Sequence, residues 1–402
     1  MTEKIQTAAG PAGDPDGELA AICAFACVPG MGARTLARVA NAFGSLGDAL
    51  RAGPEAIGAK SVELRLQRRT REFLAQLPDL EKLGAWAISA SSAAGARAIS
   101  RHDDSYPELL RRIDDPPAVL FVRGELLPSA RRVALVGARA ADEPALRLSR
   151  QLAEGLAAAG VEVVSGGARG VDAEAHAGAL WGRGRTIAVL GSGIDVAYPP
   201  ENASLFERIA AGGGALVSEL PPGTPASRPN FPRRNRTIAG LSHATVVVRA
   251  AAESGALITA SHAAAVGRPV FAVPGEPGDP LAAGPQDLLA TGAATPVRSA
   301  DDIVELLGWS QHGAQAARKG VPPTERAAAC TLAAASTGQP LKGPALRVWE
   351  VLDGGRGLHV DALAARAQLR PQEALQGLTE LELKGLIHQK PGKVFVRRPS
   401  FS

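Results

Sequence analysis

Short apolar runs alternate with amphipathic stretches between about residues 99 and 308 of this 402-residue chain. Runs rich in Val, Ile and Leu and bounded by turn residues are typical of strands covered on both faces, whereas longer periodic stretches are typical of helices. The pattern predicts strands at 132–137, 161–165, 186–191, 215–219, 244–248 and 270–273, with helices such as 143–159, 172–181 and 254–266 between them. This order predicts an α/β domain with a doubly wound, Rossmann-like and largely parallel sheet.

The segments on either side of this domain have different patterns. Residues 18–98 read as a small helical domain with short loops. At the other end, three helical stretches (344–352, 360–367 and 371–384) precede two apolar runs around Pro391-Gly392, which predicts a winged helix at 343–398. Residues 1–17 are polar and 309–342 are low in complexity, so we expect a disordered leader and a linker there.

A glycine-containing turn within the helical domain is a candidate phosphate contact. Gly30 and Gly32 precede the apolar helix that starts near Thr35. Glycines here let the turn tighten and leave the next helix's amide groups open to an anion, as in a helix-hairpin-helix or SAM-like domain. The alternative is a plain helical hairpin whose glycines only make the turn.

Composition and charge restrict the function classes only weakly. The chain has 44 Lys+Arg and 40 Asp+Glu, a net charge of +4, and 46% apolar residues, which excludes a wholly disordered chain. Residues 342–398 alone contain ten basic and six acidic residues, so the rest of the chain is neutral. No apolar run is long enough to cross a membrane, and the amino terminus is no signal peptide, so we expect a cytoplasmic protein without membrane contact.

Motifs for metals, cofactors and covalent catalysis are missing. The cysteines, Cys23, Cys27 and Cys330, form neither a disulfide framework nor a metal-ligand pattern, and the first two are expected to be core residues on one helix face. The chain has no G-x-x-x-x-G-K-[ST], G-x-S-x-G or H-E-x-x-H motif, and no G-x-G-x-x-G after the first strand. We therefore expect no metal, no cofactor and no catalytic residues.

Glycine, hydroxyl and arginine side chains instead follow the predicted strands. The carboxyl ends of parallel strands meet at one edge of the sheet, where glycine amides, helix amino termini and arginines can bind phosphates. A row of such loops suits a nucleic-acid strand, and Phe231 is placed to stack on a base. The predicted contacts are Gly137, Arg139, Ser165, Gly166, Gly167, Arg169, Gly170, Phe231, Arg233, Arg234, Asn235, Arg236, Ser254 and Gly255.

Simpler structural interpretations of these residues stay open. The segment 165–172 can be only a tight strand-to-helix turn, and Phe231 can be a loop anchor packed into the core. Asp172 and His176 lie four apart on one predicted helix, where they can pair with each other or cap the helix.

Several long blocks resemble the DNA-processing protein A family (DprA, also called Smf). They include SGGARGVDAEAH at 165–176, TIAVLGSGIDVAYPPEN at 186–202, FPRRNRTIAGLS at 231–242 and SGALITASHAAAVGRPVFAVPG at 254–275. The resemblance implies a cytoplasmic bacterial protein without catalytic activity that binds single-stranded DNA through its Rossmann-like domain. It further implies protection of incoming strands during natural transformation, RecA loading onto DNA covered by single-strand-binding protein, and a homodimer through the Rossmann-like domain. The family's binding residues fall on Arg139, Arg169, Phe231 and the Arg/Asn cluster after it.

Three positions depart from the family pattern. Ala138 stands where the resemblance implies a hydroxyl, which removes one phosphate hydrogen bond. Arg249 stands where an acidic residue is usual, which is expected to add positive charge near the site. Gln286 replaces a common Asn.

Two other functions are weighed against this one. A nucleotide phosphoribohydrolase with a similar Rossmann-like domain would use Glu253, although the P-G-G-x-G-T-x-x-E motif is missing. A regulator of double-stranded DNA would act through the winged helix. Its recognition segment at 371–384 carries Glu373, Glu380 and Glu382 against Lys384, which disfavours insertion into a DNA groove.

Overall fold

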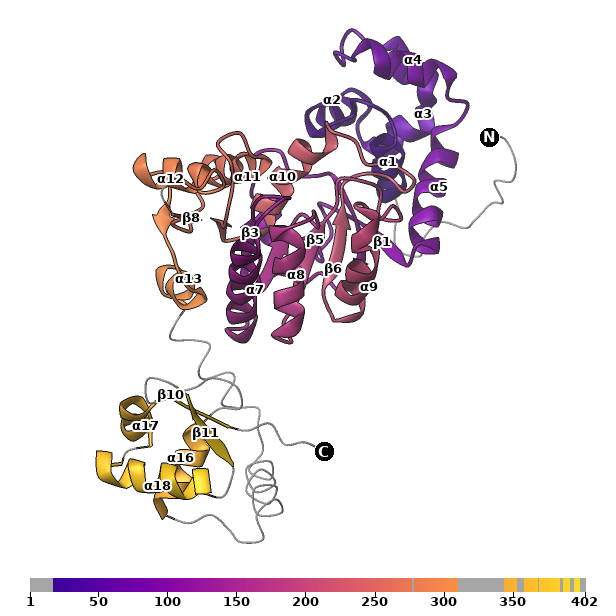
Figure 1. The fold of residues 1–402 in the computed structure, drawn as a ribbon. Coiled ribbons are helices and arrows are strands. Elements are labelled where there is room, and N and C mark those ends of the chain that lie inside the picture. The colour runs from indigo at the N-terminus through magenta and orange to yellow at the C-terminus, as the bar shows by residue number, and fades with distance from the viewer. Residues whose placement is uncertain are drawn as a thin grey trace. The chain divides into compact units, whose positions relative to one another are not determined.

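The computed structural model describes residues 17–276, 278–309, 343–352, 358–367, 369–383, 386–390 and 394–397. The chain divides into two compact units, residues 1–313 and 314–402 (Figure 1). Most of the predicted leader, most of the predicted linker with Cys330, and the Pro391-Gly392 turn lie outside the described residues. The finer domain boundaries stay predictions, and the predicted boundary between residues 98 and 99 falls within a strand.

A nine-stranded sheet forms the centre of the first unit, in the order β1-β2-β6-β5-β4-β3-β7-β8-β9. The strands from β6 to β9 in this order run parallel, which confirms the predicted doubly wound fold. At the other edge β1 and β2 are antiparallel, so the sheet is mixed. The strands are β1 Ala96–Ser100, β2 Val119–Gly124, β3 Arg132–Val136, β4 Glu162–Ser165, β5 Thr186–Val189, β6 Ala215–Ser218, β7 Ala244–Val247, β8 Val270–Ala272 and β9 Thr295–Pro296.

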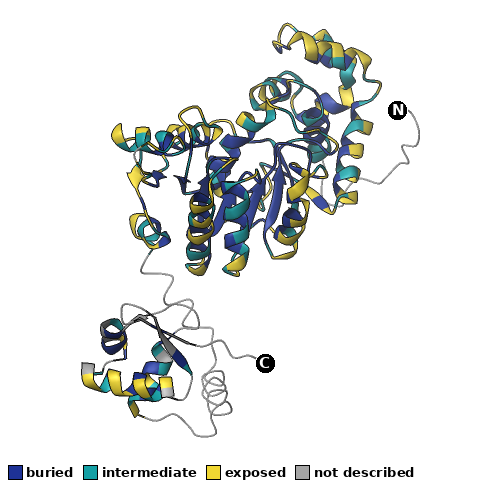
Figure 2. Cartoon of the chain, in the orientation of Figure 1, coloured by how far each residue is buried: buried dark blue, intermediate teal, exposed yellow. Residues whose placement is uncertain are grey.

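Helices cover both faces of this sheet because successive residues of its parallel strands are apolar and point alternately to the two faces. On β3, Val133 and Leu135 share a core with α7, α8 and α13, whereas Ala134 and Val136 share one with α10 and α11. Figure 2 shows the buried strands between helices whose outer faces are exposed. The helices are α6 Glu108–Arg111, α7 Glu143–Ala158, α8 Val171–Trp181, η1 Pro200–Asn202, α9 Ala203–Ala211, α10 Asn230–Leu241, α11 Gly255–Ala265, α12 Ala283–Ala290 and α13 Ala300–Leu306.

Five amino-terminal helices form a bundle that packs on the antiparallel edge of the sheet through α1 and α5. Residues of α1 and of its neighbours share one apolar core with Val119 and Phe121 of β2 and with Phe206 of α9. Cys23 is buried and Cys27 half-buried, and neither takes part in a disulfide among the described residues. The helices are α1 Glu18–Ala26, α2 Ala33–Phe43, α3 Leu46–Ala59, α4 Arg68–Gln76 and α5 Leu80–Ala93.

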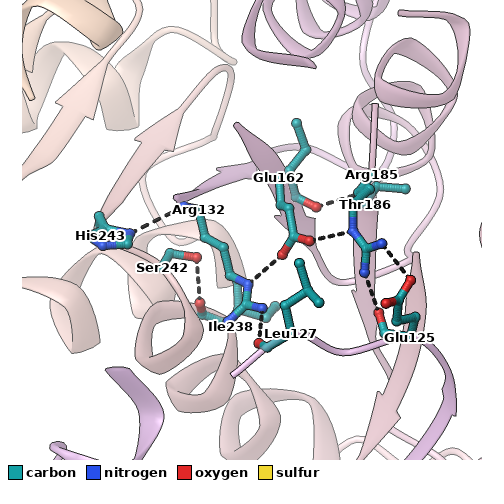
Figure 3. A network of polar contacts seen from close by, with 10 residues as sticks. Glu125, Leu127, Arg132, Glu162, Arg185, Thr186, Ile238, Ser242 and His243 are labelled. Atoms are coloured by element: carbon teal, nitrogen blue, oxygen red, sulfur yellow. Dashed lines mark hydrogen bonds and ion pairs between the residues drawn. The ribbon is translucent and has the colours of Figure 1, made fainter. Parts of the chain in front are cut away.

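A charge network with a buried pair at its centre joins the strands at their starting ends (Figure 3). Arg132 is completely buried, and its Nε donates to Glu162 Oε2 at 2.7 Å. The other Glu162 oxygen accepts from Arg185 Nε at 2.6 Å, and Arg185 reaches Glu125 Oε2 at 2.7 Å. The network thus connects β3, β4 and β5 with the segment that follows β2, and every charge in it has a partner of opposite sign.

Among its described residues, the second unit has three helices and a three-stranded sheet in the order β10-β12-β11. Its core contains Val348, Leu363, Leu378 and Phe395. The elements are α16 Gly343–Val351, β10 Leu358–His359, α17 Val360–Arg366, α18 Pro371–Leu383, β11 Ile387–Lys390 and β12 Val394–Arg397, an arrangement that confirms the predicted winged helix. In the part of the chain that the structure describes, no helix is long and apolar enough to cross a membrane.

Candidate nucleic-acid interface

The segments after β3, β4 and β7 meet the first turns of α10 and α11 around a cavity of about 520 Å³. A small hollow of about 30 Å³ is lined by several of the same side chains. Nine of the predicted contacts line these two spaces: Gly137, Arg139, Gly166, Arg169, Phe231, Arg234, Asn235, Ser254 and Gly255. The fold therefore brings together residues that are more than a hundred positions apart.

Phe231 lies on α10 and not in a loop, in contrast to the sequence-based expectation. Its half-buried ring is 5.6 Å from the Tyr198 ring, and the Arg139 guanidinium carbon is 5.0 Å from the Phe231 centroid. Gly191 lies close to the ring, because a Cβ there would stand 2.7 Å from Phe231 Cδ1. Tyr198 was not predicted as a site residue, although it follows the same strand end as Gly191.

Two arginines of the cavity are exposed. Their guanidinium groups form no ion pair or hydrogen bond with any described residue. The Arg139 guanidinium lies over the Phe231 ring, and Arg228 lines the cavity without an ion pair among the described residues. Arg228 was missed from sequence, although it lies only three residues before Phe231. An arginine without an internal partner retains its capacity to bind an external anion.

Arg169 has an internal counterion. Its Nε donates to Glu201 Oε1, which lies on the 3₁₀ helix η1, and both side chains are largely exposed. The hydrogen bond to Glu201 raises the pKa of Arg169, and the same contact lowers the pKa of Glu201. A phosphate that binds Arg169 must therefore compete with a carboxylate.

Arg234 is directed into the protein. It is 6% exposed, and its Nη1 donates to the carbonyl oxygens of Gly166, at 2.5 Å, and Val189. Burial lowers its pKa to about 10, while the charge of Asp172 opposes this shift. Its Nε is buried without a hydrogen-bond partner among the described residues. Arg234 thus links α10 to the ends of β4 and β5.

Asp172 and His176 do not pair with each other. Asp172 Oδ2 accepts from the amide of Gly166 at 3.1 Å, and burial raises the pKa of this carboxyl despite the nearby Arg234. Thr186 Oγ1 donates to Val163 O and accepts from His176 Nδ1 at 2.7 Å, so the His176 ring carries its proton on Nδ1. Burial lowers the pKa of His176 to about 3.

The remaining residues of α10 mostly bind other parts of the fold. Arg236 donates to Glu219 Oε2 at 2.6 Å and to Asp115 O, and Asn235 Nδ2 donates to Gly255 O at 3.0 Å. Arg233 is exposed and stands 4.0 Å from Glu219. Neither Arg233 nor Arg236 lines the two spaces.

Three residues of the 165–170 segment hold the strand-to-helix turn. Ser165 Oγ donates to Leu135 O at 2.6 Å inside the protein. Gly170 has a φ of 72°, and a Cβ there would stand 2.4 Å from Ala138 O. Gly167 has a φ of 65° and lies against Phe206. These contacts favour the structural interpretation for Ser165, Gly167 and Gly170, which do not line the two spaces.

The three departures from the family pattern have local structural partners. Ala138 is 8% exposed, and its amide donates to Arg249 O at 2.7 Å. Arg249 adds no free charge to the site, in contrast to our expectation, because it pairs with Asp279 at 3.5 Å. Gln286 Nε2 donates to the carbonyls of Gly275 and Glu276.

The glycine turn of the helical domain lies apart from this cavity. Gly30 and Gly32 are exposed, Gly30 has a φ of 82°, and Gly32 precedes α2 without a side-chain cap. Glu253, the residue that a hydrolase would use, is exposed and does not line the cavity. Among the described residues, no group of three or more His, Cys, Asp or Glu could hold a metal ion.

Comparisons with known proteins agree on one family. The family model of DNA recombination-mediator protein A matches residues 97–308, and that of the DprA winged helix domain matches 333–393. The chain is 34% identical to Protein Smf of Synechocystis over 93% of its own length and 98% of the relative's. It is 38% identical to a putative DNA processing protein DprA of Mycobacterium tuberculosis, over 83% and 79% of the two chains.

Solved structures of the family also resemble the chain. One of them is an X-ray structure of DNA processing protein A from Streptococcus pneumoniae, with a TM-score of 0.50 and 33% identity. The match covers 64% of this chain and 92% of the other.

Proposed function

This chain belongs to the DNA recombination-mediator protein A family, and from that premise we propose that it binds single-stranded DNA along the carboxyl edge of its sheet. One observation carries the proposal: two arginines without internal partners, Arg139 and Arg228, line one cavity together with the half-buried ring of Phe231. The arginines would bind phosphates, and the ring would stack on a base that only a single strand exposes.

The predicted contacts then fall into two groups. Arg139, Arg228 and Phe231 would touch the strand directly, together with Gly137 and the start of α11 at Ser254 and Gly255. The other group would shape the site, as Arg234 does through the carbonyls of Gly166 and Val189. Arg169 belongs to the first group only when Glu201 releases it.

On this proposal, the protein is a recombination mediator of natural transformation. It would protect incoming single strands and load RecA onto DNA covered by single-strand-binding protein, as a cytoplasmic homodimer joined through the Rossmann-like domain. No catalytic step is required of it. Light scattering would measure the dimer, and RecA filament growth on covered single strands would measure loading.

Fluorescence anisotropy with a labelled oligothymidine and with a duplex of equal length tests the binding proposal. Arg139→Ala should weaken single-strand binding and reduce the slope of log affinity against log salt by about 0.7. Phe231→Ala should cost about 1–3 kcal/mol with little change in that slope, because it removes stacking and no charge. Arg208→Ala, an exposed arginine on α9, serves as the control. Unchanged affinity in both site variants would refute the proposal.

A further inference from the structure

A second concentration of positive charge lies on the helical domain, outside the site described above. Residues 60–72 contain five basic and two acidic residues, whereas the rest of 17–95 contains four basic and five acidic ones. Arg68 pairs with Glu72 at 2.7 Å. The side chains of Arg65, Arg69 and Arg71 are exposed and have no partner among the described residues. We call Arg65, Arg68, Arg69 and Arg71 the α4 arginine surface.

The glycine turn lies directly beside this surface. Thr70 stands between Arg69 and Arg71 in the sequence and is buried. Its hydroxyl donates a hydrogen bond to Pro29 O at 2.7 Å. Gly30 fits against the same hydroxyl, since a Cβ there would stand only 2.6 Å from Thr70 Oγ1. The arginines and the exposed glycines thus lie at one corner of the helical domain, and α4 lies at its outer end (Figure 1).

An exposed apolar side chain accompanies the charges. The Val62 side chain is 87% exposed. It lies in a tight turn that is closed by a hydrogen bond from Arg65 N to Val62 O. Arg65 adopts a left-handed conformation with a φ of 51°, which is uncommon for a residue with a side chain. A nucleic-acid partner with exposed sugar and base faces suits such a mixture of cations and apolar surface better than a duplex, which buries its bases.

We propose that the α4 arginine surface and the turn at residues 29–32 form a second binding surface for phosphates of single-stranded DNA. The strand would be the one that the sheet edge holds, so this inference rests on the proposed function and extends it to longer strands. The surface would add contacts only when a strand reaches beyond the first site. Short strands would therefore not use it.

Two double variants of the full chain test this inference. Arg69→Gln with Arg71→Gln removes two charges from the surface, and Arg183→Gln with Arg208→Gln removes two exposed arginines from the Rossmann-like domain. Binding is measured with an oligothymidine of about 8 nucleotides, within the length that one groove holds, with one several times longer, and with a duplex. Thermal melting confirms that both variants fold.

We expect the α4 variant to bind the long strand about tenfold more weakly at 0.1 M salt, with a salt slope reduced by about 1.4. Its affinity for the short strand should equal that of the unchanged protein, and the control variant should match that protein with both strands. Equal affinities of the two variants for the long strand would overturn the inference. So would a loss confined to the duplex.

The same measurements distinguish failure of the proposed function from failure of this inference alone. If the sheet edge does not bind DNA, Arg139→Ala leaves the short-strand affinity unchanged. If only the inference is wrong, Arg139→Ala weakens binding of both strands while the α4 variant weakens neither.

Discussion

The arginines at the carboxyl edge of the sheet differ in whether a carboxylate of the protein already pairs with them. Arg139 and Arg228 have no ion pair with any residue that the structure describes, Arg169 pairs with Glu201, and Arg236 is held by Glu219. The sequence identifies the cluster, because glycine and arginine follow strand after strand. The sequence does not show which of these arginines lack an ion pair, because the residues that bind the others are distant in sequence. Arg236, for example, bonds to Asp115, 121 positions away.

Glu201→Gln should strengthen single-strand binding severalfold. The change removes the carboxylate that competes with phosphate for Arg169, so one more phosphate contact becomes available, and the salt slope should steepen by about 0.7. Anisotropy titrations between about 50 and 200 mM salt measure both quantities. Glu207→Gln is the matched control, because Glu207 pairs with Arg123 outside the cavity. Weaker binding by Glu201→Gln would contradict this assignment.

The buried His176 should make stability depend on pH. Its pKa of about 3 in the folded protein lies below the ordinary 6.5, because burial disfavours the charged ring. Protons therefore favour the unfolded chain: the stabilisation is complete above pH 6.5 and falls by about 1.4 kcal/mol per pH unit towards pH 3. Urea unfolding at pH 7, 6 and 5 should show this slope in the unchanged protein and not in His176→Gln. Parallel slopes in the two proteins would contradict it.

At the scale of elements, six of the seven parallel strands were predicted to within about two residues at each end, because strands buried on both faces are continuous apolar runs; the two-residue β9 was not predicted. β1 and β2 were not predicted: β1 reads ARAIS, with few apolar residues, and both lie outside the strand–helix alternation. The start of α10 was not predicted as helical, since Phe231 was expected in a loop after a strand. Pro232 occupies the first turn, where a missing amide hydrogen costs nothing.

Arg234 should couple α10 to the turn after β4. Arg234→Leu leaves the buried Asp172 without a nearby positive charge, so we expect a loss of about 3–5 kcal/mol in the free energy of unfolding. Adding Asp172→Asn should recover part of this loss, because the amide still accepts a hydrogen bond and carries no charge. A double-mutant cycle by urea unfolding measures the coupling. Strictly additive losses would mean that the two residues act independently.

At the scale of the whole molecule, net charge is a poor guide to the site. The segment 342–398 accounts for the net +4, whereas the sheet edge lies in a neutral remainder. The position of unpaired arginines, and not their number, distinguishes the candidate site. Periodicity predicted the overall architecture, but the packing of the five amino-terminal helices on β1 and β2 depends on contacts between distant segments.

The first unit should bind single strands without the second. A fragment of residues 1–313 contains the complete sheet and both proposed binding surfaces. Its single-strand affinity should stay within about twofold of that of the full chain, with the same salt slope, because phosphate contacts determine that slope. Anisotropy under matched salt compares the two proteins. A clearly smaller slope for the fragment would place phosphate contacts on the winged helix.

The amino-terminal helices share a core with the sheet, so the folding unit extends beyond the segment that the family model matches. The family match begins at residue 97, inside β1, whereas α1 and its neighbours cover Val119 and Phe121. A fragment cut at the start of that match would expose these side chains on one face of the sheet. A large exposed apolar patch favours association with other chains. For this protein, the segment that identifies the family is therefore shorter than the segment that a fragment must contain to stay soluble.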